Sequence, residues 1–274
     1  NGLKQSGAFS IEAGELARGA TAYVTLEPCA HHGRTPPCAN ALVNAGIARV
    51  VGAASDPDPR VSGKGYAILR AAGIEVVEKV LAAEASEQLA GYLIRSLKKR
   101  PEVILKLALS SDGKIGVRGG GQVSITGEVA RREVHLMRAE ADAILVGIGT
   151  ALEDDPALTV RLPGLEKRSP ARIVLDRQIR LPEGSKLVAG IDRVPLYIAA
   201  CEEADAGRRA ALERAGVRFI GTETHEGGVA LPELLDDLAA LGMASVLVEG
   251  GAAVAKAFLA DDLVDRIVIF QGPE

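Results

Sequence analysis

Apolar residues along this chain fall into two patterns that alternate with each other. Short runs rich in Val, Ile and Leu are typical of buried strands, whereas apolar residues three or four positions apart are typical of helices. In the first hundred residues, these patterns predict strands at 21–26, 49–53 and 74–77 and helices at 39–45, 66–72 and 84–97. Segment 56–59, Asp-Pro-Asp-Pro, predicts a turn after the second strand.

The alternation resumes after a basic break at residues 98–101, Lys-Lys-Arg-Pro, where Pro101 cannot continue the preceding helix. Because helices and strands alternate on both sides of the break, we expect two α/β domains, residues 1–99 and 102–274, each with a mainly parallel sheet covered by helices. In the second domain, the patterns predict strands at 103–109, 143–146, 172–175, 196–200, 245–249 and 266–270 and helices at 128–138, 208–215, 232–241 and 252–259.

Composition narrows the classes of function. The 274 residues carry a formal net charge of −4, which argues against a broad basic surface for nucleic acid. The three cysteines, Cys29, Cys38 and Cys201, are too few and too scattered for a secreted disulfide framework. No apolar run is long enough to span a bilayer, and residues 1–20 carry too many charges for a signal peptide. We therefore expect a cytoplasmic protein that binds neither nucleic acid nor membranes.

The densest chemistry lies at residues 27–38, which read Glu-Pro-Cys-Ala-His-His-Gly-Arg-Thr-Pro-Pro-Cys. The segment follows a predicted strand and leads into a predicted helix, whose first turn would favour the thiolate form of Cys38. Two thiolates can bind Zn²⁺, and a catalytic zinc then takes a third protein ligand and a water whose pKa it lowers. The alternative is a pair of unrelated buried cysteines, since free cysteine often packs as a small apolar residue.

This segment resembles the deaminase of riboflavin biosynthesis, a branch of the zinc deaminases that share H-x-E and P-C-x-x-C motifs. The resemblance implies a cytidine-deaminase-like fold and hydrolytic deamination of a diaminopyrimidinone that carries a ribosylamino 5′-phosphate. It also implies that Cys29 and Cys38 bind Zn²⁺ and that His31 and Arg34 lie in the loop that meets the substrate.

The H-x-E motif of that family, which supplies a zinc-binding His and a proton-shuttling Glu, does not occur in the 274 residues. We expect it just upstream of Asn1, and we expect residues to be missing at both ends, because the chain lacks an initial Met and stops shortly after the apolar run 267–270. Glu27 does not replace the missing Glu, because it belongs to the Pro-Cys turn.

In the second half, polar and glycine-rich segments follow the predicted strands. Ligands of open α/β sheets bind outside the carboxyl ends of strands, and a helix N-terminus there can bind phosphate. Any one such segment is more often an ordinary loop. The segments read Leu-Lys-x-Ala-x-Ser-x-Asp-Gly-Lys at 105–114, Ile-Thr at 125–126, Val-Gly-x-Gly-Thr at 146–150, Asp-Asp-Pro-x-Leu-Thr-x-Arg at 154–161 and Val-Glu-Gly-Gly at 248–251.

Together with Arg138, these segments resemble the riboflavin-pathway reductase, whose fold is similar to dihydrofolate reductase. The resemblance implies hydride transfer from NADPH to C1 of the ribosylamino group, and a homodimer. It implies that NADPH contacts Ala108, Ser110, Thr150, Asp154, Gly251, Ala252, Ala253, Val254, Ala255, Lys256 and Ala257. It implies that the substrate contacts Arg138, Leu158, Arg161 and Glu249, and a guanidinium suits a 5′-phosphate because it can donate two parallel hydrogen bonds.

Five further residues stand out less. Ser124 occupies a position where many members of that reductase family have Trp, and Asp112 is a candidate general acid by location alone. His135 lies three residues before Arg138 on one helical face, where a surface or packing role is the simpler interpretation. We interpret Cys201 as structural and His225 as solvated.

Three functional hypotheses follow. The first is a bifunctional deaminase–reductase. The second is a reductase with a non-catalytic N-terminal domain, which oxidises NADPH without releasing ammonia. The third is a non-enzymatic nucleotide-binding protein in which Cys29 and Cys38 form a structural zinc clip.

Overall fold

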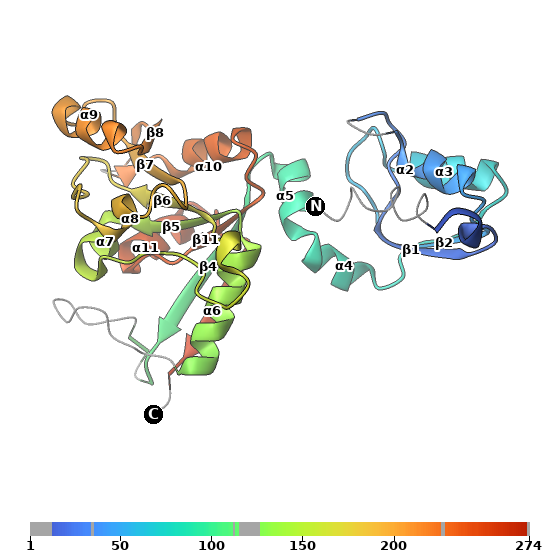
Figure 1. Cartoon of the computed structure of the whole chain (residues 1–274), viewed down its shortest axis with the longest axis horizontal. Coiled ribbons are helices and arrows are strands. Elements are labelled where there is room, and N and C mark those ends of the chain that lie inside the picture. Colours follow the sequence, from blue (N-terminus) through green and yellow to red (C-terminus); the bar gives the residue numbers. More distant parts are fainter. Residues whose placement is uncertain (1–12, 34–35, 112, 115–126, 226–227, 273–274) are drawn as a thin grey trace. The chain divides into compact units, whose positions relative to one another are not determined.

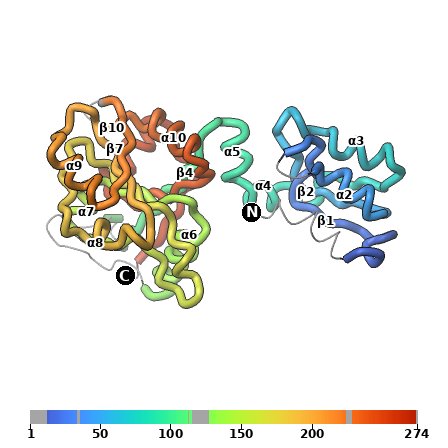
Figure 2. The backbone as a smooth tube through the Cα atoms, turned by 45° about the horizontal axis from the view of Figure 1, so that its top comes forward, coloured from blue at the N-terminus to red at the C-terminus, as the bar shows by residue number. Residues whose placement is uncertain are grey.

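The computed structural model describes residues 13–33, 36–111, 113–114, 127–225 and 228–272. The chain divides into two compact units, Asn1–Lys98 and Lys99–Glu274, at the basic break noted in the sequence (Figures 1 and 2). Arg34, Asp112, Ser124 and the Ile-Thr pair at 125–126 lie outside the described residues. Each unit is an α/β fold with parallel strands, as the sequence predicts.

The N-terminal unit contains a three-stranded parallel sheet in the order β1-β2-β3. Helix α2 connects the first two strands and α3 connects the next two, as parallel neighbours require. Leu42, Val50 and Leu69 are buried between these helices and the sheet. The described elements of this unit are η2 (Gly14–Ala17), β1 (Thr21–Leu26), α2 (Cys38–Asn44), β2 (Arg49–Ala54), α3 (Lys64–Ala71), β3 (Glu75–Val77), α4 (Ala82–Gln88) and α5 (Ala90–Lys98).

The single long helix predicted at 84–97 is wrong, because this segment forms two helices, α4 and α5, that meet at Leu89. Ala85 in α4 is buried beside Leu26 and Ala54, and Leu89, Tyr92 and Leu93 pack against the same small cluster. Gly91 lowers the helix propensity at the start of α5. The apolar periodicity therefore predicts the buried residues correctly but does not reveal the break.

The C-terminal unit contains a seven-stranded sheet in the order β12-β4-β11-β5-β6-β7-β8, and every pairing in it is parallel. Strand β11 comes late in the chain but inserts between β4 and β5, which brings residues near 105, 145 and 248 side by side. Its strands are β4 (Glu102–Leu109), β5 (Ala143–Gly147), β6 (Ala171–Leu175), β7 (Leu196–Ala200), β8 (Arg218–Gly221), β11 (Ser245–Val248) and β12 (Arg266–Gln271).

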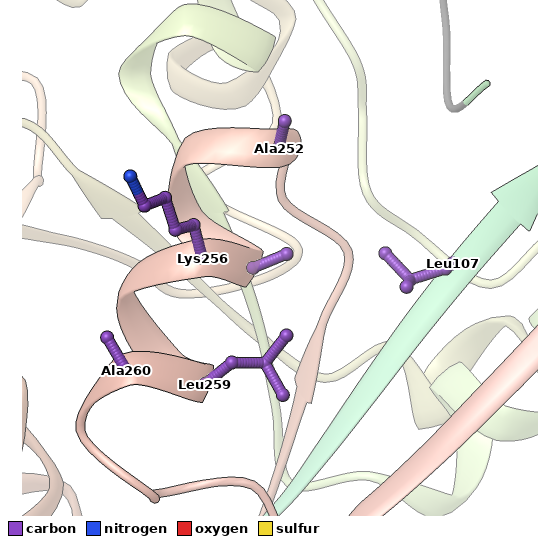
Figure 3. Close-up of a pocket in the computed structure, with 6 residues that line it drawn as sticks. Leu107, Ala252, Lys256, Leu259 and Ala260 are labelled. Atoms are coloured by element: carbon purple, nitrogen blue, oxygen red, sulfur yellow. The ribbon is translucent and has the colours of Figure 1, made fainter.

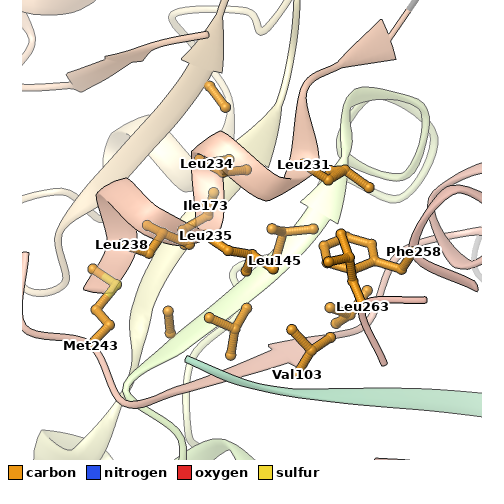
Figure 4. Packing of buried hydrophobic residues seen from close by; sticks show 14 of the residues in the cluster. Val103, Leu145, Ile173, Leu231, Leu234, Leu235, Leu238, Met243, Phe258 and Leu263 are labelled. Atoms are coloured by element: carbon orange, nitrogen blue, oxygen red, sulfur yellow. The ribbon is translucent and has the colours of Figure 1, made fainter. Parts of the chain in front are cut away.

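Helices cover both faces of this sheet, so its central strands are buried on both sides, as all-parallel sheets require. Helices α10 and α11 supply Leu234, Leu235 and Phe258 to the cluster on one face, where they pack on residues such as Val103 and Leu145 (Figure 4). Helices α7, α8 and α9 cover the other face, and α6 packs there beside Ile104 and Leu247. The helices are α6 (Glu128–Glu140), α7 (Ile148–Asp154), α8 (Lys186–Ala189), α9 (Ala206–Arg214), α10 (Leu231–Ala240) and α11 (Ala252–Ala260).

The sequence patterns missed six of the described elements in this unit. Helix α7 begins in a glycine-rich segment that reads as a loop, and α8 spans only four residues. Strand β8 was not predicted, nor was the short antiparallel pair β9 (Thr224–His225) and β10 (Gly228–Val229), nor the 3-10 helix η3 (Glu166–Arg168). Among the described helices, none combines the length and the apolar character needed to cross a membrane.

Candidate functional sites

Glu27 is a structural residue of the N-terminal unit. Its side chain is buried, and its carboxylate accepts hydrogen bonds from the backbone N–H groups of Gly63 and Gly65, each at 3.0 Å. These N–H groups lie at the start of α3, where an acidic side chain satisfies otherwise unpaired donors. A Cβ on Gly65 would lie 1.9 Å from the carbonyl oxygen of Pro28, so only glycine allows this close approach. The geometry agrees with the exclusion of Glu27 as a proton shuttle.

Cys29 and Cys38 lie together at the end of β1 and the start of α2. The backbone N–H of Cys38 donates to the Sγ of Cys29 at 3.1 Å, and both cysteines are reduced and half-buried. Burial raises the pKa of the Cys29 thiol, and the neighbouring Cys38 thiol adds to this effect. A bound cation would reverse this balance, because metal ligation requires thiolates.

His31 lies in the loop between the two cysteines. Its Nδ1 atom is buried and has no hydrogen-bond partner within the described part of the chain. Nearby, Asp56 is buried and its two carboxylate oxygens accept from the Tyr92 hydroxyl at 3.0 Å. The Asp58 carboxylate accepts from Arg60, which holds the pKa of Asp58 well below its usual range. Side-chain hydrogen bonds therefore hold the Asp-Pro-Asp-Pro segment, and the turn itself begins at its last residue, Pro59.

The cysteine pair fits part of a zinc site. Two adjacent sulfur donors, one of them accepting a backbone N–H, are suitable ligands. No group of three His, Cys, Asp or Glu side chains suited to a metal ion occurs among the described residues. A catalytic zinc needs three protein ligands, so these residues alone do not complete the predicted site.

In the C-terminal unit, two glycine-rich segments meet at the carboxyl ends of β5 and β11. A Cβ on Gly147 would lie 2.7 Å from Cγ2 of Val254, and one on Gly250 would lie 2.7 Å from Cβ of Val254. Gly147 therefore permits α11 to pack closely on the end of β5, and Gly250 permits the tight entry of the chain into α11. Gly251 faces Thr150, whose Oγ1 would lie 3.5 Å from a Cβ built there. The predicted cofactor residues Thr150 and Gly251 are thus brought together.

The first turns of α7 and α11 both lie at this edge of the sheet. Their N-cap residues, Gly147 and Gly251, provide no side-chain hydrogen bond to the first backbone N–H groups. Ala252 and Ala253 are exposed, and a Cβ on Gly149 would meet no atom within 4 Å. Unpaired N–H groups at a helix N-terminus favour phosphate binding, and two such termini side by side strengthen that preference.

A pocket of about 500 Å³ lies between α11 and β4. Leu107 lines one side and Ala252, Lys256, Leu259 and Ala260 line the other (Figure 3). Apart from Lys256, the lining side chains are apolar. Part of the predicted cofactor stretch therefore lines a pocket, and Ala255, which also lines it, is largely buried in the hydrophobic cluster beneath α11.

Arg138 and Glu249, both predicted to contact substrate, form a nearly buried ion pair. The Arg138 Nε and Nη2 atoms donate to the two Glu249 carboxylate oxygens at 2.7 and 2.9 Å, and Nη1 donates to the Thr159 carbonyl at 3.2 Å. The two side chains are only 13% and 8% exposed. The edge of the guanidinium that suits a phosphate is therefore occupied by Glu249, which changes the role we assign to Arg138.

Several charges set the ionisation of Glu249. Burial alone would raise its pKa, but hydrogen bonds and positive charge from Arg138 outweigh burial, so the pKa of Glu249 is lowered. Lys106 on β4 acts in the same direction, as does His135 on α6 when its ring is protonated. The arrangement concentrates positive charge around one carboxylate at the carboxyl end of β11.

Arg161 has its guanidinium exposed beside this pair. Its backbone N–H donates to Nδ1 of His135 at 3.3 Å, and its Nε lies 3.5 Å from Nε2 of the same ring. A neutral imidazole has only one acceptor nitrogen, so we take the shorter contact, to Nδ1, as the hydrogen bond. Burial lowers the pKa of His135, and the Arg138 and Arg161 charges lower it further, which favours this neutral form.

The remaining predicted residues lie around this edge with different accessibility. Ala108 and Ser110 lie at the end of β4, where the Ser110 hydroxyl donates to the Lys114 carbonyl and accepts from the Lys114 N–H. Asp154 is half-buried at the end of α7, and burial raises the pKa of its carboxyl. The Leu158 side chain is buried in the core, so only the backbone of Leu158 remains available for a ligand contact.

Sequence reasoning placed Lys106 in the first polar strand-end segment and weighed a position at the pocket edge for His135, but it assigned neither residue a contact. Lys106 lies close enough to Glu249 to lower its pKa, and His135 accepts the Arg161 N–H. A lysine inside the otherwise apolar strand β4 was the available signal for Lys106. The contact of His135 with a segment 26 positions away had no sequence signal.

The geometry defines a class of protein: an α/β chain whose larger parallel sheet has positively charged groups and helix N-termini suited to phosphate at the carboxyl ends of its strands. Residues 101–274 match the family model for the RibD C-terminal domain. The riboflavin biosynthesis protein RibD of Aquifex aeolicus (strain VF5) is 40% identical over 263 residues, covering 96% of this chain and 72% of that protein. RibD of Escherichia coli (strain K12) is 40% identical over 273 residues, with the same two coverages.

Solved structures give the same result. Acinetobacter baumannii RibD, form 1, is 38% identical, with a TM-score of 0.84 over 98% of this chain and 73% of that one. A Thermotoga maritima diaminohydroxyphosphoribosylaminopyrimidine deaminase/5-amino-6-(5-phosphoribosylamino)uracil reductase is 35% identical, with a TM-score of 0.80 over 97% of this chain and 71% of that one. The chain belongs to the RibD family of riboflavin biosynthesis proteins. Its C-terminal unit is the RibD reductase-type domain.

Proposed function

We propose that the C-terminal unit reduces 5-amino-6-(5-phosphoribosylamino)uracil to the ribitylamino product, with NADPH as the reductant. The observation that carries the proposal is the set of polar groups at the carboxyl edge of the seven-stranded sheet. These groups come from β4, α6, α7, the segment after α7 and the β11–α11 junction. The Thermotoga maritima relative bears this reductase activity in its name and covers the same residues.

The two helix N-termini support a cofactor site. The N–H groups at the start of α7 and α11 suit the phosphates of a dinucleotide, and Thr150 offers a hydroxyl between them. The apolar pocket beside α11 suits an aromatic ring, and Lys256 at its rim suits a phosphate. The predicted cofactor residues that are exposed, such as Ala252 and Ala253, would make these contacts through their backbone.

The charged cluster supports a substrate site. The Arg161 guanidinium is exposed, and the Arg161 backbone is hydrogen-bonded to His135 on α6. We assign Arg161 the role of binding the substrate 5′-phosphate. We assign Arg138 the task of holding Glu249 and the Thr159 carbonyl in place. Glu249, ionised and oriented by two hydrogen bonds, is suited to accept hydrogen bonds from sugar hydroxyls.

A bound NADPH would supply the hydride that C1 of the ring-opened imine form of the sugar accepts, with NADP⁺ as the oxidised product, and the imine nitrogen would take a proton from water. The residues of the chain bind and orient the reactants, which is the protein's usual share of cofactor chemistry. Lys106 lies beside Glu249 and adds positive charge to the site.

The test is NADPH oxidation by the full chain with this substrate, followed in the wild type and in the Arg161→Ala variant. We expect wild-type turnover and a substrate KM about 10- to 100-fold higher in the variant, as for lost hydrogen bonds to a charged group. The NADPH KM should change by less than about twofold. A matched control is Arg168→Ala, which removes another exposed arginine from the same unit. Equal increases in both KM values would remove the phosphate role of Arg161.

A second candidate function is zinc-dependent deamination by the N-terminal unit. It is favoured by the contact of the Cys38 N–H with Cys29 Sγ and by the deaminase named for the Thermotoga maritima relative. The described residues supply two of the three protein ligands that a catalytic zinc needs, so we derive no catalytic step from them. Cys29 and Cys38 would bind the metal, which would supply an activated water.

Metal analysis of the full chain after equilibration with Zn²⁺ and gel filtration tests this assignment. We expect Cys29→Ser and Cys38→Ser each to lower retained zinc by about tenfold or more, since each removes one ligand. Cys201→Ser is the matched control, because Cys201 belongs to the other unit. Equal zinc contents in all the variants would remove the metal role of the cysteine pair.

A further inference from the structure

Residues 158–161, here named the arginine strap, carry Arg161 to the site and are held at three successive points. The Leu158 side chain is buried in the core, and its φ of 53° lies in the left-handed region that non-glycine residues seldom adopt. The Thr159 carbonyl accepts from Arg138, and the Arg161 N–H donates to His135. A strained conformation persists only where its surroundings impose it, so these contacts define the path of the strap.

His135 and Arg138 both come from α6 and are three residues apart, so they share one face of that helix. Arg138 is fixed by its ion pair with Glu249 at the end of β11. Helix α6 therefore links the end of β11 to the arginine strap through the side chains of Arg138 and His135. Only one of the two, His135, contacts the backbone of Arg161 itself.

We propose that His135 is a positioning residue that holds Arg161 in register for the substrate phosphate. The proposal rests on the proposed function, which gives Arg161 that ligand. Neutral His135 accepts the Arg161 N–H through Nδ1. Protonated His135 has no acceptor nitrogen, and its charge repels the two arginines.

The groups that face His135 are Arg138 on its own helix, Arg161 on the strap and Glu249 at the end of β11. Burial and the two arginines oppose protonation of the ring, whereas Glu249 and the Thr159 carbonyl favour it. Protonation therefore occurs only below the ordinary imidazole range, at about pH 6.5 and lower. Substrate binding should weaken as the pH falls through that window.

Steady-state kinetics of the full chain test the proposal with His135→Ala, His135→Asn and the exposed control Glu133→Ala, which lies on the same helix. Loss of one neutral hydrogen bond should raise the substrate KM of His135→Ala about two- to tenfold, with the NADPH KM unchanged. The Asn amide oxygen can replace Nδ1 as acceptor and does not titrate. His135→Asn should therefore keep a near-wild-type KM at about pH 7.5 and lack the wild-type rise in KM toward about pH 5.5.

Calorimetric binding of ribose 5-phosphate to the same variants provides a readout that needs no turnover. Weaker binding in His135→Ala, with wild-type binding in His135→Asn and Glu133→Ala, supports positioning. Unchanged KM and binding in His135→Ala would overturn it, and so would equal losses in the Ala and Asn variants. Binding that depends on His135 in a protein that does not oxidise NADPH would overturn the proposed function and keep the positioning role. Absence of both binding and turnover in the wild type would overturn both.

Discussion

The two candidate sites of this chain are assembled in different ways. Cys29 and Cys38 are nine residues apart, on either side of one loop, and the Cys38 backbone N–H donates to the Cys29 Sγ. Arg138 and Glu249 are 111 residues apart and meet because β11 inserts between β4 and β5. The local pair is easy to recognise in the sequence, but it needs a ligand from elsewhere. The distant pair has no local signature, but the parallel sheet brings its members together.

The two sites also differ in how easily the sequence reveals them and in whether the described residues supply all of their parts. The N-terminal segment displays the two cysteines of a zinc deaminase, yet the described residues offer no set of three donors. The C-terminal site is dispersed along the chain, yet it contains an ion pair, two helix N-termini and an exposed guanidinium at one edge. The fold therefore shows whether a site has all of its residues, and a cluster of motif residues in the sequence does not.

The largest expected effect concerns the buried pair. Arg138→Ala leaves the Glu249 carboxylate buried without its partner, and we expect a loss of about 3–5 kcal/mol in the free energy of unfolding, measured by urea denaturation. Arg132→Ala, an exposed change on the same helix, should stay within about 0.5 kcal/mol of the wild type. Replacing both partners, with Arg138→Met and Glu249→Leu, should recover most of the loss. Equal free energies of unfolding for Arg138→Ala and Arg132→Ala would contradict the ion pair between Arg138 and Glu249.

A smaller effect should appear in the N-terminal unit. Glu27→Ala removes a buried carboxylate that accepts the N–H groups of Gly63 and Gly65, and we expect a loss of about 2–3 kcal/mol. Hydrogen exchange should locate the change, with faster exchange of amides at the start of α3. The exposed Glu87→Ala is the control. Unaltered α3 exchange in the Glu27 variant would show that the carboxylate does not hold this helix.

The smallest effect is a pH dependence of stability. The pKa of His135 is lowered in the folded state, so on acidification the unfolded chain takes up this proton first. The stabilising contribution is full above the ordinary imidazole pKa, about 6.5, and is lost as the pH falls below it. Urea denaturation between about pH 7.5 and about pH 5.5 should show a steeper loss in the wild type than in His135→Asn. Parallel curves would mean that His135 does not titrate differently on unfolding.

Much of the fold could be predicted from the sequence because apolar periodicity reports burial. The predicted strands at 21–26 and 196–200 match β1 and β7 residue for residue, since Glu27 marks the end of the first and Pro195 the start of the second. Helix α7 was missed because its first turn contains Gly149, and α8 because four residues are too few to show a period. The break between α4 and α5 was missed because both helices bury residues in one cluster.

The residues of the candidate site were predicted from the family resemblance more than from the pattern of apolar and polar residues. Resemblance named Arg138, Arg161 and Glu249 as neighbours of one ligand, and the structure brings them to one edge. It did not reveal that Arg138 and Glu249 bind each other, because pairing depends on the register of β11 against its neighbours. The contact of His135 with Arg161 likewise depends on the path of a loop that has no periodic pattern.

Hydrogen–deuterium exchange of the full chain with and without NADPH tests the central claim, that the carboxyl edge of the seven-stranded sheet is the reductase site. The account predicts protection of the backbone amides at the start of α7 and α11, in segments 148–150 and 252–254. Amides of α2 and α3 in the N-terminal unit should exchange as in the free protein. Absence of protection at both helix N-termini, or protection confined to the N-terminal unit, would contradict the account.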